Sequence, residues 1–189
     1  MEASHLKIYK SLLRNKLRQN VSRIGILERK RKSLRILKQL LHTQAFRNSQ
    51  NILTYVSLGG EVETEAFIQK SLAAGKNIFA PRVSSKRGEM EIFRVRHPSH
   101  DLKKGFKGIP EPRKKLSAQV NPRDLDLILV PGLGFDRQGR WLGRGGGYFD
   151  RFLKQAVKAK KIGLAFREQI LKKIPEAIHD VSVDQVLTD

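Results

Sequence analysis

A buried strand that leads into a glycine-dense loop and then a helix constrains this chain more than any other feature. Residues 125–130 form an apolar run of the length of one buried strand, and Pro131 ends it. Four glycines fall within residues 143–147, and a helical pattern follows over residues 148–159. Glycines let backbone N–H groups converge on an anion, and a helix N-terminus adds positive partial charge. The segment therefore predicts a phosphate-binding loop carried by an α/β fold.

The common phosphate-binding motifs do not account for this loop. The string G-x-x-x-x-G-K-[ST] is absent, and the spacing G-x-G-x-x-G fails because Tyr148 stands three positions after Gly145. By motif, the chain is neither a P-loop NTPase nor a Rossmann dehydrogenase. Taken alone, the segment leaves a flexible surface hairpin as the alternative.

Strands and helices alternate along most of the chain. Apolar runs predict strands over residues 52–56, 77–80, 89–95, 125–130, 161–165 and 183–188. Helical patterns cover residues 65–74, 148–159 and 167–173, and residues 97–123 are expected to be a connecting loop. Alternation of this kind favours a single-domain, three-layer α/β/α fold over residues 1–189, with a largely parallel central sheet. The polar and apolar alternation in residues 89–95 indicates one antiparallel strand.

Ligands of open α/β sheets bind at the carboxyl ends of the strands. Residues 57–61, 81–82 and 131–135 each follow a predicted strand. We therefore expect one cleft to collect them.

The N-terminal part is predicted to be a basic helical segment. Over residues 6–24, apolar side chains recur at helical spacing: Leu6, Tyr9, Leu13, Leu17, Val21 and Ile24. Lys10 and Arg14 are four residues apart and project from the same side of that helix. A second basic helical stretch follows, with Leu34, Leu37 and Leu41 expected to face inward.

Composition excludes several classes of protein. The formal net charge is +20, from 38 Lys and Arg against 18 Asp and Glu, so the chain attracts polyanions such as nucleic acid, ATP or a polycarboxylate. The absence of cysteine excludes disulfides, thiol catalysis and zinc–thiolate sites. No run approaches the ~18 apolar residues of a transmembrane helix, so we expect no membrane association through such a helix.

The segment from Val130 to Asp150 resembles the signature of the 5-formyltetrahydrofolate cyclo-ligase family, also called 5,10-methenyltetrahydrofolate synthetase. That signature usually reads V-P-G-x-x-F-D-x-x-G-x-R-L-G-x-G-x-G-Y-Y-D. Further blocks extend the resemblance over nearly the whole length: Lys10-x-x-x-Arg14, residues 55–64, Pro81-Arg82, residues 108–112, residues 163–166, His179-Asp180 and residues 184–188. Each block is weak alone, but their order and spacing together are specific.

The resemblance implies an ATP- and Mg²⁺-dependent enzyme. It would cyclise 5-formyltetrahydrofolate, polyglutamylated or not, to 5,10-methenyltetrahydrofolate by phosphorylating the formyl oxygen, with release of ADP and phosphate. A cytoplasmic monomer is expected. Residues 1–47 hold 13 Lys and Arg and two acids, which mimics a transit peptide, but Lys10 and Arg14 fall on the family pattern and belong to the working domain.

The resemblance also implies roles for individual residues. Catalytic roles fall on Lys10, Arg144 and Tyr148. Nucleotide binding falls on Lys10, Arg14, Arg140, Trp141, Leu142, Gly143, Arg144, Gly145, Gly146, Gly147, Tyr148 and Phe149. Folate binding falls on Val56, Glu61, Phe135, Arg144 and Tyr148. The metal ligands would be Asp150 and Asp180.

Three features depart from the family pattern. Phe149 replaces the second tyrosine before the metal aspartate, and Trp141 stands where the family has arginine, with Arg140 as a neighbouring source of charge. The strong basicity is the third departure, since the reaction does not require it. Two alternatives therefore stay open: a basic nucleic-acid-binding protein, and a folate-binding homologue without activity.

Overall fold

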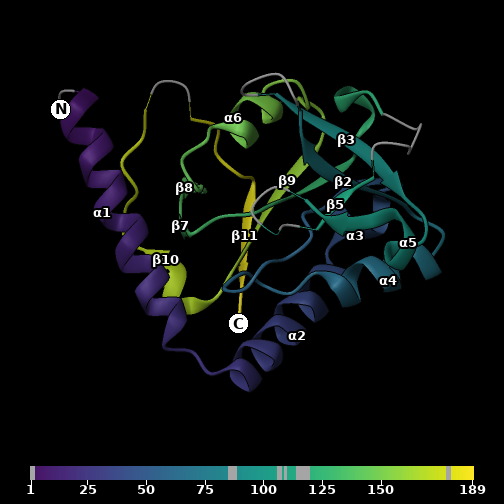
Figure 1. Cartoon of the computed structure of the whole chain (residues 1–189), viewed down its shortest axis with the longest axis horizontal. Coiled ribbons are helices and arrows are strands. Elements are labelled where there is room, and N and C mark those ends of the chain that lie inside the picture. Colours follow the sequence, from purple (N-terminus) through teal and green to yellow (C-terminus); the bar gives the residue numbers. More distant parts are fainter. Residues whose placement is uncertain (1–2, 85–88, 106–107, 109, 114–119, 178–179) are drawn as a thin grey trace.

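The computed structural model describes residues 3–84, 89–105, 108, 110–113, 120–177 and 180–189. Its centre is a six-stranded sheet in the order β11-β9-β6-β1-β2-β3 (Figure 1). The strands are β1 (Asn51–Leu53), β2 (Asn77–Val83), β3 (Met90–Val95), β6 (Leu127–Val130), β9 (Lys160–Ala165) and β11 (Gln185–Thr188). All neighbours pair in parallel except β2 and β3, which are antiparallel. The predicted α/β fold with a largely parallel sheet is confirmed.

Strand β6 shows why the sheet is covered on both faces. All four of its residues are buried, as expected for a central parallel strand. Leu127 and Leu129 join one core cluster, whereas Ile128 and Val130 join the other, because successive side chains point to opposite faces. Both faces of the strand are therefore packed, which gives the three layers.

The two clusters are completed by different helices. The first takes residues from α2 (Ile26–His42), α3 (Gln44–Asn48) and α4 (Glu65–Ala73), and the second takes residues from α6 (Tyr148–Leu153). Helix α2 is also tied to the far end of the chain, because the buried Lys32 ammonium lies 2.7 Å from Glu168 Oε1 and 3.0 Å from Asp189 Oδ2.

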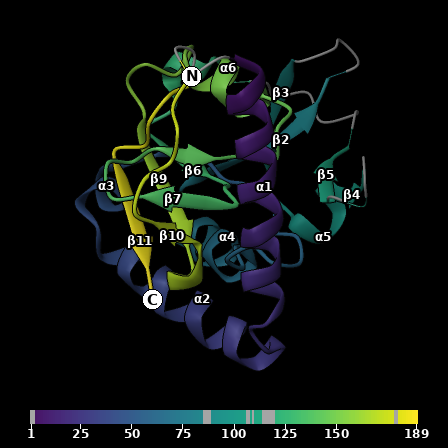
Figure 2. The ribbon, with the colours of Figure 1, turned by 90° about the vertical axis from the view of Figure 1, so that its left-hand side faces the viewer.

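Helix α1 (Ala3–Ser22) lies along the side of the molecule, beside a small second sheet (Figure 2). That sheet has the order β10-β7-β8, from Ile170–Leu171, Gly134–Asp136 and Trp141–Leu142. Leu17 of α1 is buried in a cluster with Leu142 of β8 and Ile174. The first helix and the strands around the glycine loop are therefore one packed unit.

Short elements occur in the described part of the segment that the sequence suggested was a loop. They are α5 (Pro98–Asp101), β4 (Leu102–Lys104), β5 (Pro110–Pro112) and the 3₁₀ turn η2 (Pro122–Asp124), which starts within residues 97–123 and ends one residue beyond them. β4 and β5 form an antiparallel pair of their own. The loop prediction is therefore wrong where these elements lie. Among the described helices, none is long and apolar enough to cross a membrane.

Several predicted boundaries also change. β2 continues through Pro81, because its parallel pairing with β1 stops at Phe79 and the missing N–H of the proline breaks no bond with that strand. The helix expected over residues 148–159 ends at Leu153. The helix expected over residues 167–173 is instead a 3₁₀ turn, η3 (Arg167–Gln169), followed by β10.

The prediction that Leu34 faces inward is wrong, and the apolar stripe of α1 is not buried throughout. Leu34 is 59% exposed and Tyr9 is 47% exposed. On α2, the buried face includes Ser33 and Ile36 instead. The Ser33 hydroxyl accepts a hydrogen bond from the Glu63 backbone N–H at 3.1 Å, so a polar contact fixes the rotation of the helix.

One close contact gives a test of the packing between β7 and the central sheet. A Cβ added at Gly163 of β9 would lie 2.3 Å from the fully buried Phe135 ring. We expect Gly163→Ala to lower the free energy of unfolding by about 1–3 kcal/mol, as overpacking does, measured by urea denaturation. Gly59→Ala is the control, since its Cβ would meet nothing within 4 Å and should change stability by less than about 0.5 kcal/mol. Equal stability of the two variants would contradict this packing.

Candidate active site

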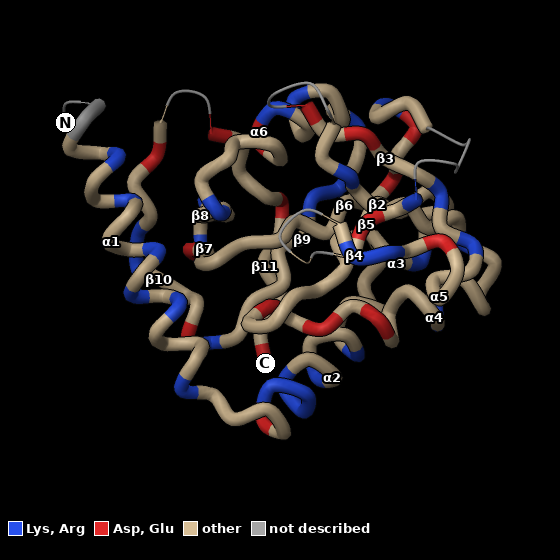
Figure 3. The backbone as a smooth tube through the Cα atoms, in the orientation of Figure 1, with Lys and Arg blue, Asp and Glu red and all other residues tan. Residues whose placement is uncertain are grey.

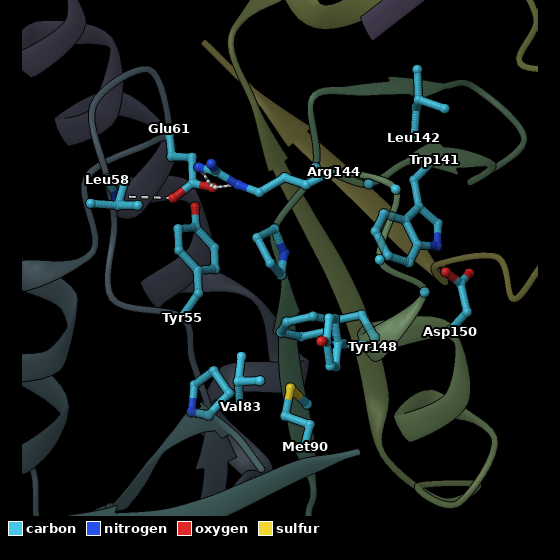
Figure 4. A pocket seen from close by; sticks show the side chains of 18 of the residues that line it. Tyr55, Leu58, Glu61, Val83, Met90, Trp141, Leu142, Arg144, Tyr148 and Asp150 are labelled. Atoms are coloured by element: carbon cyan, nitrogen blue, oxygen red, sulfur yellow. Dashed lines mark hydrogen bonds and ion pairs between the residues drawn. The ribbon is translucent and has the colours of Figure 1, made fainter. Parts of the chain in front are cut away.

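A cavity of about 340 Å³ lies at the carboxyl ends of β1, β2 and β6 (Figure 4). Residues of the segment after β1 form one wall, and residues 141–150 form the opposite wall. Pro81, Val83, Met90 and Pro131 complete its apolar lining. The three segments that follow predicted strands thus meet at one site, and the volume falls in the range of small-molecule pockets.

The glycine loop has the conformation that its sequence demands. Gly145 and Gly147 have φ values of 102° and 66°, a region that residues with a Cβ rarely adopt. Gly147 is also the residue at the N-cap of α6. The backbone N–H groups of Gly145 and Gly146 donate no hydrogen bond to any other described residue. The loop therefore offers donors to an anion.

Arginines hold the loop from outside the cavity. The Arg14 Nε donates to the Gly143 carbonyl at 2.9 Å, and an Arg151 nitrogen donates to the Gly146 carbonyl at 2.9 Å. Burial lowers the pKa of Arg14 from its ordinary value, and the charge of Arg18 adds to that effect. Arg14 therefore acts from behind the loop and is not among the residues that line the cavity.

Lys10, Asp150 and Asp180 form a charged cluster at the edge of the cavity. The Lys10 ammonium lies 2.5 Å from Asp180 Oδ2. Burial raises the pKa of the half-buried Asp150, and the charge of Asp180 raises it further, whereas a hydrogen bond from the Val181 backbone and the charge of Lys10 oppose the shift. The two carboxylates are therefore close enough to repel one another, and a bound cation would relieve that repulsion.

A second ion pair spans the two walls. The Arg144 Nη2 lies 2.7 Å from Glu61 Oε1, and the other oxygen of Glu61 accepts from the Leu58 backbone N–H at 2.9 Å. Figure 4 shows the Arg144 side chain extended toward Glu61. Burial raises the pKa of Tyr55 well above 10.0, so its hydroxyl stays neutral and donates to the Val62 carbonyl at 3.0 Å.

Most residues that the resemblance implied lie around this cavity. Those that line it are Lys10, Val56, Glu61, Trp141, Leu142, Gly143, Arg144, Gly145, Gly146, Gly147, Tyr148, Phe149, Asp150 and Asp180. The sequence thus brings together residues from the first helix, the middle of the chain and its last loop.

Phe135 and Arg140 do not line the cavity, and their predicted contacts are corrected here. The Phe135 ring is fully buried, because Gly132 and Gly163 leave room for it beneath the pocket. The Arg140 Nε lies 2.7 Å from the buried carboxylate of Asp136, in a tight turn away from the cavity.

Other lining residues were not predicted as site residues. Tyr55 and Leu58 flank Val56 within a family block, which was the signal available for them. Glu111 is buried and lies in the block of residues 108–112. Met90 enters from β3, and no motif in the sequence marks it.

The sheet, the glycine loop and the cavity between them define an α/β protein with a ligand-sized site at the carboxyl edge of its sheet. The sequence profile of the 5-formyltetrahydrofolate cyclo-ligase family matches residues 7–189. The chain is 36% identical over 184 residues to the 5-formyltetrahydrofolate cyclo-ligase of Mus musculus, covering 93% of this chain and 91% of that protein. The chain therefore belongs to this family, whose members are named as ligases.

Two further comparisons agree. The mitochondrial 5-formyltetrahydrofolate cyclo-ligase of Arabidopsis thaliana is 30% identical over 205 residues, covering 95% of this chain and 73% of that protein. The NMR structure of Aquifex aeolicus 5,10-methenyltetrahydrofolate synthetase superimposes with a TM-score of 0.83 at 34% identity, covering 95% of this chain and 89% of that one. The family resemblance read from the sequence is confirmed.

The charge cluster predicts a pH-dependent effect of Asp150→Asn in the ligand-free protein. A folded-state pKa above the ordinary value of 3.8 means that the ionised carboxylate destabilises the fold at neutral pH, and this cost fades as pH falls through the raised pKa. We expect Asp150→Asn to raise the Tm at pH 7, with the gain shrinking to near zero below pH 4. Thermal melts in EDTA across this range measure it, and a gain that grows toward low pH would contradict the assignment.

Proposed function

We propose that this protein catalyses the ATP- and Mg²⁺-dependent cyclisation of 5-formyltetrahydrofolate to 5,10-methenyltetrahydrofolate. The observation that carries the proposal is the construction of the cavity. One wall holds Glu61 among apolar side chains, and the other holds the glycine loop with Lys10 and two carboxylates beside it. A pterin and a triphosphate could thus lie in contact, as a phosphoryl transfer between them requires. Family membership supports the same reaction.

The chemistry needs charge neutralisation and alignment more than a nucleophilic side chain. The formyl oxygen is a poor leaving group until it takes the γ-phosphoryl group of ATP, which releases ADP. The N10 amine then adds to the activated carbon and loses its proton to solvent, phosphate departs with the former formyl oxygen, and the five-membered ring is closed. Lys10, Arg144 and the loop N–H groups would stabilise the negative charge on the transferred oxygens.

Asp150 and Asp180 are the residues that would hold Mg²⁺. Magnesium in nucleotide sites takes one or two carboxylates, together with phosphate oxygens and water, and the pair fits that need. Among the described residues there is no cluster of three or more His, Cys, Asp or Glu side chains that would hold a metal without the nucleotide. The ion, when bound, neutralises phosphate charge. Lys10 would then turn from Asp180 toward the phosphates.

Glu61 and Tyr148 would hold the folate. A carboxylate at 9% side-chain exposure in an apolar wall can accept hydrogen bonds from the N–H donors of a pterin ring. Tyr148 lies in the opposite part of the cavity (Figure 4), where its ring can stack on a planar ligand. Cytoplasmic location, the monomeric state and the handling of polyglutamate stay predictions.

The surplus positive charge gives the nucleic-acid alternative its one structural support. Lys and Arg residues gather along α1 and α2 (Figure 3), and among them only Lys10 lines the cavity. A nucleic-acid binder would lose affinity steeply with salt and would not depend on Asp150. An inactive homologue would bind folate without hydrolysing ATP.

The principal test is formation of 5,10-methenyltetrahydrofolate, followed by its absorbance in the presence of 5-formyltetrahydrofolate, Mg²⁺ and ATP. We expect turnover with ATP and none without it. Lys10→Ala should lower kcat/KM by about 10²–10³, as loss of a cation at the transferring phosphoryl group does. Lys16→Ala is the matched control on the same helix, because Lys16 is exposed and lies outside the cavity. A flat trace from folded wild-type protein would overturn the proposed reaction.

Arg144→Gln tests the ion pair that spans the walls. Without the guanidinium, Glu61 is free for folate, so affinity for 5-formyltetrahydrofolate in the absence of ATP should rise severalfold while the KM for ATP rises about tenfold or more. Isothermal titration calorimetry and initial rates measure the two effects. Arg140→Gln breaks an ion pair of the same 2.7 Å length outside the cavity and should change neither constant. Weaker folate binding in Arg144→Gln would show that Arg144 holds folate instead of competing with it.

A further inference from the structure

We propose that Trp141 is a positioning residue for the metal-binding carboxylates: its indole N–H fixes the segment that carries Asp180 next to Asp150. This inference rests on the proposed function, since it assigns the pair a cation to hold. The indole Nε1 donates a hydrogen bond to the Val181 carbonyl at 2.6 Å. This positioning role of Trp141 differs from direct contact with the nucleotide.

Val181 connects the two carboxylates. Its backbone N–H donates to the Asp150 carboxylate, while its carbonyl accepts from Trp141. Asp180 precedes it directly in the chain. The same segment is held a second time, because the Val183 N–H donates to the Gly139 carbonyl at 2.9 Å. The turn between β7 and β8 and the indole on β8 therefore fix the segment at two points.

The indole is itself held in place. Trp141 is 8% exposed and meets Phe149 edge to face, with ring centroids 6.5 Å apart and planes at 85°. A Cβ at Gly143 would lie 2.7 Å from the six-membered ring, so the ring packs directly on the start of the glycine loop. One side chain thus contacts the loop, the residue before Asp150 and the Asp180 segment. Figure 4 shows the indole and Asp150 in the same part of the site.

The substitution of tryptophan for the arginine of the family signature gives this position a different task. An arginine would add positive charge at the loop, whereas an indole adds none. It supplies one directed donor and a rigid, buried ring. The geometry points to control of the spacing between Asp150 and Asp180, and hence of the response of nucleotide binding to Mg²⁺.

The test compares ADP binding with and without Mg²⁺ by calorimetry, in the wild type and in Trp141→Phe. Phenylalanine keeps an aromatic ring but removes the N–H. We expect Trp141→Phe to bind ADP alone like the wild type and to lose about fivefold of the affinity gained on adding Mg²⁺, the effect of one lost hydrogen bond. Phe79→Leu is the control. Phe79 is another buried aromatic residue in the core cluster that contains Trp141, and it does not line the cavity. We expect Mg²⁺ to raise the ADP affinity of Phe79→Leu as much as it raises that of the wild type.

The outcomes separate the inference from the proposed function. The positioning role would be overturned if Mg²⁺ raised the ADP affinity of Trp141→Phe as much as that of the wild type. It would also be overturned if Phe79→Leu lost as much of this Mg²⁺-dependent affinity as Trp141→Phe. In both cases the proposed reaction would stand. A folded wild type that binds no ADP in either condition would overturn the proposed function and this inference with it.

A second measurement needs no variant. Trp141 is the one tryptophan of the chain, so its indole N–H gives a single signal in a ¹⁵N NMR spectrum. We expect that signal to move when Mg²⁺ is added to the ADP complex, because the Asp180 segment responds to the ion. A signal that Mg²⁺ leaves in place would contradict the coupling, even if Trp141→Phe did not fold.

Discussion

The seating of the Phe135 ring on glycine is the contact on which the site depends. The Phe135 ring occupies the space that side chains at positions 132 and 163 would fill, because both residues are glycine. Strand β7 can therefore approach the central sheet closely, and the ring packs in the core cluster on that face of the sheet. That approach places the β7–β8 hairpin, and the hairpin in turn delivers Trp141 and the glycine loop to the carboxyl edge of the sheet. Phe135, which does not line the cavity, thus determines where the wall formed by the glycine loop lies.

Electrostatics in the ligand-free site follows from the same arrangement. Cations and carboxylates come from opposite walls or from distant elements, and in the absence of ligands they pair with one another, as Lys10 does with Asp180 and Arg144 with Glu61. Such pairing offsets the free-energy cost of partly burying each charge, which would be larger without a partner. It also means that an anionic ligand must offer Lys10 and Arg144 better partners than the carboxylates with which they already pair.

The sequence predicted the sheet and most of the site because those features depend on local pattern and on motif. Continuous apolar runs such as residues 127–130 can only be buried on both faces, and they gave the parallel sheet. Predictions failed where contacts between residues far apart in the sequence determine the end or the rotation of a helix. Gln169 donates to the carbonyls of Gly132 and Leu133 and accepts from Phe166, which ends the expected helix after one 3₁₀ turn. The periodicity of α2 allowed a slightly different rotation, and long-range contacts select the observed one: Ser33 with Glu63, and Lys32 with Glu168 and Asp189.

The pairing of Lys10 with Asp180 joins residues 170 positions apart. During translation at ~5–20 residues per second, Lys10 is made roughly 10–30 s before Asp180. The ion pair of Lys10 therefore cannot form for much of synthesis. The cavity can be completed only after the last loop emerges, so Lys10 is made long before the site that it lines.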